Sequence, residues 1–253
     1  MKKILLLTSM CICIVSFTAC GGKNQNVSKD VEIASEEKKE DYFILDEEGV
    51  VLGLTDKAQT AKEIVVPKEV KKIPKYTFSM ENTITERVVF ENPDTVFEDQ
   101  FYDWQKLKNV ELPENMIELP NDCFNSCDVL NAIVLPEKLE IIGEGVFEFC
   151  TSLEDVEFND NLKEIGEKAF DSCHNLKILK FNDGLQKIGD SAFTDCTALQ
   201  EIYMPETVKE IAENAFIQLL SGDEIKVYVK KGSFSDKNFE TYFSAGNFIK
   251  KYY

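Results

Sequence analysis

The sequence predicts a β-rich solenoid, a fold in which short coils of chain stack on one another and share one continuous core. A phenylalanine recurs with a constant 23-residue period, at Phe78, Phe101, Phe124, Phe147, Phe170, Phe193 and Phe216. Other apolar residues recur at fixed distances from it. A single coil of this length cannot bury its own apolar side, so neighbouring coils must bury it together. We therefore expect about seven coils over residues 64–227.

Within each coil, an Ile-x-Leu alternation predicts a strand with two inward side chains. A proline follows this strand in three coils, at Pro113, Pro136 and Pro205. The chain then returns through a Leu-x-x-Ile-Gly segment, where glycine suits a tight bend (Gly143, Gly166 and Gly189). The column of apolar residues on this return side reads Val96, Leu119, Ile142, Ile165, Ile188 and Ile211. An Ala-Phe-x-x-Cys segment, expected as a short turn, closes the coil.

Two departures occur where the repeats begin. Arg87 stands where an apolar residue is expected, and Phe90 stands where the other coils have proline or asparagine. A slip of one residue would turn Val88 and Phe90 inward, and we expect this slip in the first coils.

Capping segments are predicted at both ends, as a solenoid requires. Residues 41–63 read as an N-terminal hairpin cap with its turn near Glu48 and Gly49. Residues 228–253 form the predicted C-terminal cap, in which a strand ends near Gly232 and a helix follows. Phe239, Tyr242 and Phe243 share one face of that helix, with Ser233 or Ser235 as its N-cap.

The first nineteen residues are typical of a secretory signal. Lys2 and Lys3 precede an apolar run that ends at Val15, too short to span a bilayer. The sequence Phe17-Thr-Ala-Cys20-Gly follows and resembles the bacterial lipobox, in which the cysteine is acylated and becomes the mature N-terminus. We expect residues 1–19 to be a lipoprotein signal peptide and Cys20 to carry the lipid. Ordinary secretory cleavage, with Cys20 incidental, is the alternative.

Residues 20–40 are then the lipidated cysteine and a polar, disordered tether. A random coil of this length spans about 25 Å. Since one acyl chain anchors only marginally, the two or three chains of a lipoprotein would hold the protein stably. We expect an extracytoplasmic protein, at the bacterial cell surface or anchored to a membrane, that contacts the membrane through its lipid alone. The sequence leaves open which membrane this is.

The repeat itself has a recognisable pattern. It reads Leu162-x-x-Ile165-Gly166-x-x-Ala169-Phe170-x-x-Cys173-x-x-Leu176-x-x-Leu179-x-Phe181. This pattern resembles the leucine-rich repeat family, and more narrowly the BspA-like (Treponema pallidum-type) repeats of bacterial and protist surface proteins. The resemblance implies a right-handed superhelix of the α/β type and a role in adhesion or host interaction.

Composition excludes several classes of function. The chain has 46 acidic and 28 basic residues, a net charge of −18, which disfavours nucleic-acid binding. Its single histidine, His174, removes most histidine-based catalysis and most zinc sites. His174 follows Cys173, but the sequence shows no third group to orient them. We expect no enzyme activity, no cofactor and no metal site, although Asp160 and Asp183 leave open a ladder of calcium-binding turns.

A column of cysteines stands three positions after the phenylalanines, at Cys127, Cys150, Cys173 and Cys196. Stacked side chains point the same way, which disfavours both disulfides and convergent metal ligation. We expect buried, reduced thiols that act as small apolar wedges beside the phenylalanine column.

The outward strand positions are the candidate binding surface, because they vary while the core positions recur. One column reads Val88, Glu111, Val134, Glu157, Lys180 and Tyr203, and its neighbour reads Glu86, Asn109, Ala132, Asp155, Ile178 and Glu201. The candidate ligand contacts are Val134, Glu157, Ile178, Lys180 and Tyr203. Scattered exposed apolar residues are also normal, which is the alternative.

These observations predict a monomeric, non-catalytic module that binds a protein or glycan at the cell surface. A structural or assembly scaffold in the bacterial envelope, docking another bacterial protein, is the alternative. A solute-binding transporter subunit would need two α/β lobes, and the 23-residue period speaks against it.

Overall fold

The computed structural model describes residues 42–78, 84–98, 100–217, 219, 224–244 and 247–253. The predicted signal peptide, Cys20 and the tether lie outside the described residues. Within the described part, no helix is both long and apolar enough to cross a membrane.

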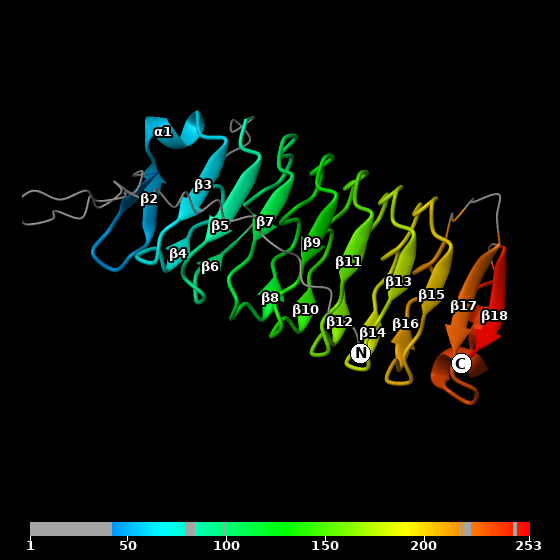
Figure 1. Ribbon diagram of the computed structural model, residues 1–253. Helices are drawn as coiled ribbons and strands as arrows, with labels where there is room; N and C mark the ends of the chain where they lie inside the picture. Colours follow the sequence, from blue (N-terminus) through cyan, green and yellow to red (C-terminus); the bar gives the residue numbers. More distant parts are fainter. Residues whose placement is uncertain (1–41, 79–83, 99, 218, 220–223, 245–246) are drawn as a thin grey trace, which may run out of the picture. The chain divides into compact units, whose positions relative to one another are not determined.

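Two rows of parallel strands run along the stacked coils (Figure 1). The first row consists of β3 (Glu63–Val66), β5 (Arg87–Phe90), β7 (Asn109–Glu111), β9 (Ala132–Val134), β11 (Asp155–Glu157), β13 (Ile178–Lys180), β15 (Glu201–Tyr203), β17 (Ile225–Val229) and β18 (Phe248–Tyr252). The second row consists of β4 (Lys72–Ile73), β6 (Val96–Phe97), β8 (Glu118–Leu119), β10 (Ile141–Ile142), β12 (Glu164–Ile165), β14 (Lys187–Ile188) and β16 (Glu210–Ile211). In the described part of the chain, seven coils thus have a strand in each row, and β17 begins a further turn.

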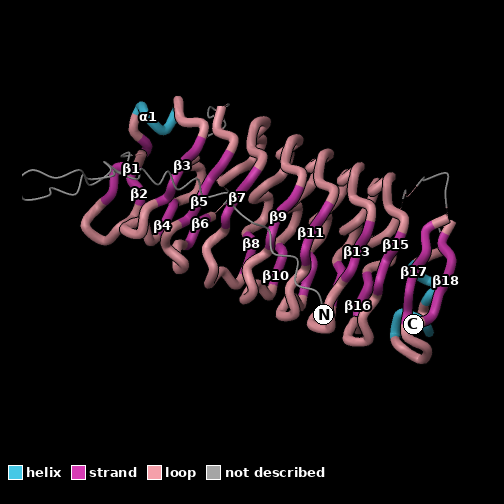
Figure 2. Tube along the Cα trace, viewed as in Figure 1, coloured by secondary structure: helices cyan, strands magenta, loops and turns pink. Residues whose placement is uncertain are grey.

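The predicted solenoid is therefore confirmed, and its period is visible in the strand register. Ile133 lies opposite Val156 in the first row, and Ile142 lies opposite Ile165 in the second. Loops and turns connect the rows, and the helices among the described residues occur only towards the two ends (Figure 2). The segment that carries the phenylalanine is a turn in the described coils.

The expected slip occurs in the coil that contains β5. Ile64 pairs with Val88, one position later than the regular period would place its partner, and Val88 pairs with Val110, one position earlier. Val88 and Phe90 are buried as a result. The same slip shifts the second row, where Phe97 is buried and Val96 is 58% exposed. The prediction that Val96 belongs to the core column was therefore wrong by one position.

The N-terminal cap is an antiparallel hairpin of β1 (Phe43–Leu45) and β2 (Val51–Leu54), followed by the single-turn helix α1 (Asp56–Gln59). Gly49 lies in its turn with a φ of 84°, a conformation that favours glycine. The Phe43 ring meets the Phe78 ring edge-on, with centroids 6.0 Å apart. The hairpin thereby covers the first end of the aromatic column.

The C-terminal cap is smaller in its helices than predicted. It contains two single-turn helices, α2 (Phe234–Lys237) and α3 (Phe239–Tyr242). Ser233 is the N-cap of α2, and its Oγ accepts a hydrogen bond from Asp236 N. The Phe243 ring packs against the Phe216 ring at 5.1 Å. The chain then adds β18, parallel to β17, a strand that the sequence pattern did not predict.

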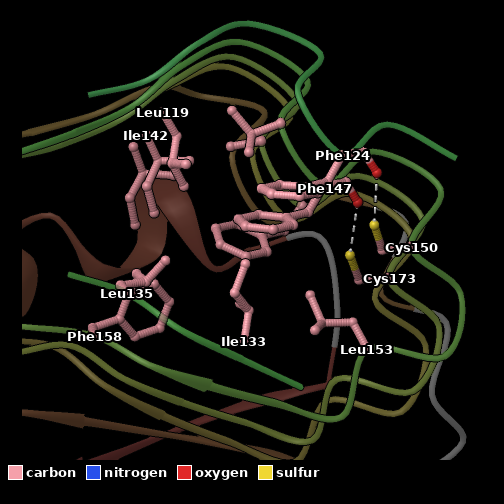
Figure 3. Close-up of a cluster of buried hydrophobic side chains, with 14 of the residues drawn as sticks. Leu119, Phe124, Ile133, Leu135, Ile142, Phe147, Cys150, Leu153, Phe158 and Cys173 are labelled. Atoms are coloured by element: carbon pink, nitrogen blue, oxygen red, sulfur yellow. Dashed lines mark hydrogen bonds between the residues drawn. The ribbon is translucent and has the colours of Figure 1, made fainter. Parts of the chain in front are cut away.

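The core is built on the phenylalanine column, all seven members of which are buried. Consecutive rings stack with centroids 5.1 to 5.5 Å apart. The rings of Phe101 and Phe124 are within 3° of parallel. Figure 3 shows Phe124 and Phe147 stacked between apolar side chains of the two strand rows, such as Ile133 and Ile142.

The cysteine column is also buried, and it forms hydrogen bonds that the sequence did not indicate. Each Sγ donates to the backbone carbonyl oxygen of the phenylalanine one coil earlier. The pairs are Cys127 with Phe101 and Cys150 with Phe124, both at 3.1 Å, and Cys173 with Phe147 and Cys196 with Phe170, both at 3.2 Å. The thiols therefore tie consecutive coils together as well as filling space (Figure 3).

Three glycines of the second row have a different role from the predicted tight bend. None of Gly143, Gly166 and Gly189 has a positive φ. A Cβ on Gly166 would lie 2.7 Å from the carbonyl carbon and oxygen of Gly143. At these three positions the backbones of neighbouring coils approach too closely for a side chain.

Candidate ligand-binding face

The outward side of the first strand row is the surface that the sequence singled out, and we refer to its residues as the ligand face. Strand register within the paired strands, continued across the two unpaired junctions by the 23-residue period, gives two columns. They are Glu63, Arg87, Asn109, Ala132, Asp155, Ile178, Glu201 and Lys226, and Val65, Val89, Glu111, Val134, Glu157, Lys180, Tyr203 and Tyr228. Val88 and Glu86 were wrongly placed in these columns, because the slip turns Val88 inward. Arg87 and Val89 take their places.

The candidate contacts lie on three neighbouring parts of this face. Val134 is 70% exposed and lies directly opposite Glu157 on the next strand. Ile178, at 48% exposure, and Lys180 project from β13. Tyr203 lies opposite Lys180 and is only partly exposed. The face therefore presents two well-exposed apolar side chains among charged ones.

Tyr203 is held within the protein by contacts that the repeat pattern missed. Its ring stacks on the ring of Tyr228 with centroids 4.4 Å apart and planes 5° from parallel. Its hydroxyl donates to Glu201 Oε2 at 2.8 Å, and this hydrogen bond is the main reason that the pKa of Tyr203 rises to about 12. Tyr228 follows Tyr203 at a distance two positions longer than the regular period, so a search for columns at that period passes over it.

Ion pairs occupy the N-terminal end of the ligand face. The Arg87 guanidinium lies between the carboxylates of Glu63 and Glu111. The hydrogen bond to Glu111 is the main cause of a raised Arg87 pKa. All three side chains are substantially exposed, so the pairs contribute little to stability. They fix side chains at this end of the face, whereas the uncharged Val134 and Ile178 lie further along it.

A groove of about 790 Å³ lies at the junction of β7 and β9. The backbone pairing of the first row is interrupted at this junction, and again between β11 and β13. Apolar side chains of both strands line the groove with Phe90, and Glu111, Glu114 and Glu137 lie around it. A second groove of about 380 Å³ shares Val134, Leu135 and Glu137 with the first and extends to Lys180. Val134 thus stands between two hollows of the ligand face.

His174 pairs with an acid and not with the neighbouring thiol. His174 Nε2 lies 3.2 Å from Asp195 Oδ2, on an exposed surface. Cys173 is fully buried, its thiol is bonded to Phe147, and burial raises its pKa well above the ordinary value. A thiol in this state is a poor nucleophile. Adjacency in sequence therefore does not produce a catalytic pair.

The turns that contain Asp160 and Asp183 are the predicted candidates for calcium binding. Asp160 and Asp183 border a hollow of about 230 Å³ together with Lys163 and Lys209. Among the residues described, no group of three or more histidine, cysteine, aspartate or glutamate side chains is placed to hold a metal ion.

Known proteins resemble the chain in its repeats and fold. Residues 56–131 and 117–244 match the family model described as a BspA type leucine rich repeat region, with six copies. A leucine-rich repeat protein from Bacteroides ovatus shares 19% identity over 81% of this chain and 64% of its own, with a TM-score of 0.56. One from Eubacterium ventriosum shares 21% identity over 70% of this chain and 48% of its own, with a TM-score of 0.63.

In both cases this chain spans less than two thirds of the solved relative. A comparison with curated proteins gives no significant match. The family model nevertheless covers most of the chain, and the solved relatives share its solenoid. The chain belongs to the family of BspA-type leucine-rich repeat proteins.

Proposed function

We propose that this protein is a non-catalytic, lipid-anchored protein of the bacterial surface whose ligand face binds a protein or glycan, in adhesion or host interaction. Membership of a leucine-rich repeat family supports a binding or scaffold module. The lipobox-like sequence at Cys20 and the polar segment after it support the anchor and the extracytoplasmic location.

One observation carries the proposal: Val134 and Ile178 are exposed by 70% and 48% on a face whose other outward residues are mostly charged. A strand needs polar outward residues to stay soluble, so apolar ones there lower solubility unless a partner covers them. The groove beside Val134 adds a concave surface to the exposed side chains. Exposed apolar groups next to a hollow are typical of a surface that contacts another molecule.

The test uses the full-length chain on the surface of a non-adherent laboratory bacterium. The variant Val134→Asp with Ile178→Asp changes the ligand face. The control variant Val96→Asp with Ile117→Asp changes two side chains at the second strand row, one in β6 and one directly before β8, both 58% exposed. We expect the first variant to lower attachment to cultured epithelial cells or mucin at least tenfold, and the control to leave it within twofold. Equal behaviour of the two variants, or no attachment by the parent chain, would contradict the proposal.

A photo-crosslinking amino acid at position 157, on the ligand face, separates adhesion from the envelope scaffold. The same group at position 118, in the second strand row, is the control. Crosslinks from position 157 to a host component support adhesion. Crosslinks from that position to a protein of the bacterium's own envelope would instead establish the scaffold and overturn the adhesion proposal.

A further inference from the structure

The groove between β7 and β9 combines an apolar floor with an acidic border. Phe90, Leu112 and Leu135 contribute to the floor, and each is buried or partly buried in the core. Val134 stands beside it with most of its side chain in solvent. A ligand side chain that entered the groove would contact hydrocarbon and lose water, which favours an aliphatic group.

Charge around the groove is strongly unbalanced. The carboxylates of Glu111, Glu114 and Glu137 line it against a single ammonium, that of Lys138. Lys138 Nζ already donates to Asn115 Oδ1 at 2.7 Å, and Glu111 already pairs with Arg87. Glu114 and Glu137 have no ion pair among the described residues, and Glu137 is exposed. Two carboxylates are therefore left available for a cationic ligand.

The second groove continues this arrangement on the other side of Val134. It is lined by Glu137, Glu157 and Asp160, with Lys180 at its far end. Along the outward column, Val134 stands between Glu111 and Glu157. The strand spacing of about 4.8 Å applies to Glu157, which is paired opposite Val134. On the other side the pairing is interrupted and Glu111 is already paired with Arg87, so the carboxylates available there are those of Glu114 and Glu137 at the groove.

We infer that the ligand face binds a polypeptide segment in which an aliphatic side chain is flanked, two positions away on each side, by lysine or arginine. This inference rests on the proposed function and narrows its ligand from protein or glycan to a basic polypeptide. In an extended peptide, alternate side chains on one side are about 7 Å apart. This spacing is longer than the distance of about 4.8 Å between neighbouring coils, and the flexible side chains of lysine and arginine can span the difference. Their hydrocarbon stems pack on apolar surface while their charged ends reach a carboxylate.

The same charges argue against an anionic ligand. The chain has a net charge of −18, and a uronic or sulfated glycan would meet unpaired carboxylates at the groove. Like-charge contacts of this kind are unfavourable and exclude wrong partners. The overall field instead raises the encounter rate with a cationic segment.

The experiment measures fluorescence anisotropy of a labelled ten-residue peptide that repeats Arg-Ser-Leu-Ser-Arg twice, with the full-length protein. Two further peptides replace the arginines by glutamate or the leucines by serine. We expect the first peptide to bind at least tenfold more tightly than either of the others. Because the groove supplies apolar contact, we expect binding to weaken but persist as salt is raised.

Protein variants test the position of the site. Glu137→Lys should weaken binding of the arginine–leucine peptide at least tenfold, and Val134→Ser should weaken it several-fold. Glu144→Lys makes the same change of charge at an exposed glutamate outside both grooves and should stay within twofold. An equal effect of Glu137→Lys and Glu144→Lys, equal binding of all three peptides, or no binding would overturn the inference.

The proposed function fails separately. If attachment of cells depends on Val134 and Ile178 but the basic peptide does not bind, the inference is overturned and the proposed binding face stands. If the peptide binds as expected while the parent chain confers no attachment, adhesion is overturned and the chemistry of the groove is supported.

Discussion

The thiol of Cys173 donates a hydrogen bond of 3.2 Å to the backbone carbonyl oxygen of Phe147 in the preceding coil. The same oxygen accepts the backbone N–H of Cys150 at 3.0 Å. One carbonyl oxygen thus closes the turn of its own coil and also accepts a hydrogen bond from the next coil. Because the pattern recurs along the column, the cysteines are linkers between coils rather than reactive groups.

The described thiols should therefore react slowly in the native protein. Cys123, Cys127, Cys150, Cys173 and Cys196 are all buried and free of disulfides. Burial raises the pKa of Cys150 and Cys196, which keeps the reactive thiolate scarce. Alkylation followed by peptide mass spectrometry should show slow labelling in buffer and fast labelling in denaturant. Rapid labelling of Cys150 in the native protein would show that the column is not a packed core.

Replacing Phe147 by alanine should lower the free energy of unfolding by roughly 3–5 kcal/mol, as for other buried phenylalanines. Its ring is stacked on both sides, against Phe124 and Phe170. Phe149 is a matched control, since it is 47% exposed two positions later. Phe149→Ala should cost less than about 1 kcal/mol in the same chemical denaturation series. Similar losses for both variants would mean that the stack does not support the fold.

Gly166→Ala should destabilise the protein by about 1–3 kcal/mol, because the added Cβ would overlap the Gly143 backbone and the coils would have to separate. In Gly53→Ala the nearest atom to the new Cβ is Ile44 Cδ1 at 4.0 Å, so this control should be close to neutral. Thermal unfolding of the two variants checks the difference. A neutral Gly166→Ala would show that the close approach between the coils is easily relaxed.

Stability should depend on pH through Glu148. Burial, and then repulsion by Asp171, raises the pKa of Glu148 above its ordinary value of 4.5. The folded state then binds the proton more tightly than the unfolded state. Protonation of Glu148 therefore stabilises the fold below about pH 4, and this stabilisation is lost as pH rises through the folded pKa. Glu148→Gln should therefore unfold at the wild-type temperature in acid and at a higher temperature near neutral pH.

The amide of the glutamine variant can still accept the hydrogen bond that Asn125 Nδ2 donates to Glu148 at 2.9 Å. Glu144→Gln removes one negative charge from an exposed position nearby and serves as the control. If the difference in unfolding temperature between Glu148→Gln and wild type stays constant from acid to neutral pH, the pH dependence does not come from Glu148.

Lipid attachment at Cys20 is tested by growing cells with a labelled fatty acid. Cys20→Ser should abolish labelling of the protein and release it from the membrane fraction, because the acyl chains on Cys20 are the proposed anchor. Cys13→Ser, within the apolar run before the predicted cleavage site, should be labelled normally. Labelling of the Cys20→Ser protein would show that the anchor lies elsewhere.

Much of the fold could be predicted because one residue type marks every coil. The Phe column defines the period, and the residues at fixed offsets from it, such as Ile133 and Ile142, fall in the core. The second strand row could not be predicted, since very short strands such as Ile141–Ile142 show no alternation. β18 was not predicted because it follows the last repeat, where none of the repeated columns continues.

The site was predictable in part. Outward positions such as Val134 and Ile178 follow from strand alternation, so their exposure was foreseeable. The grooves could not be predicted, because they depend on where the backbone pairing of the first row is interrupted. Backbone atoms are the same in every residue, so the sequence pattern does not mark these interruptions. The partner of Tyr203 was missed because the last coil is longer than the regular period.

The shifted coil at β5 has a consequence for folding fidelity. Repeats of equal length can align with the wrong neighbour, which is a characteristic misfolding route of repeat proteins. Relative to the 23-residue period, this coil pairs one position late with the coil before it and one position early with the coil after it. The strand pairs β9–β11 and β13–β15 keep the regular period. Misalignment by one whole repeat would leave Val88 or Phe90 facing solvent. The irregular coil thus favours the correct stacking order over an order that is shifted by one repeat.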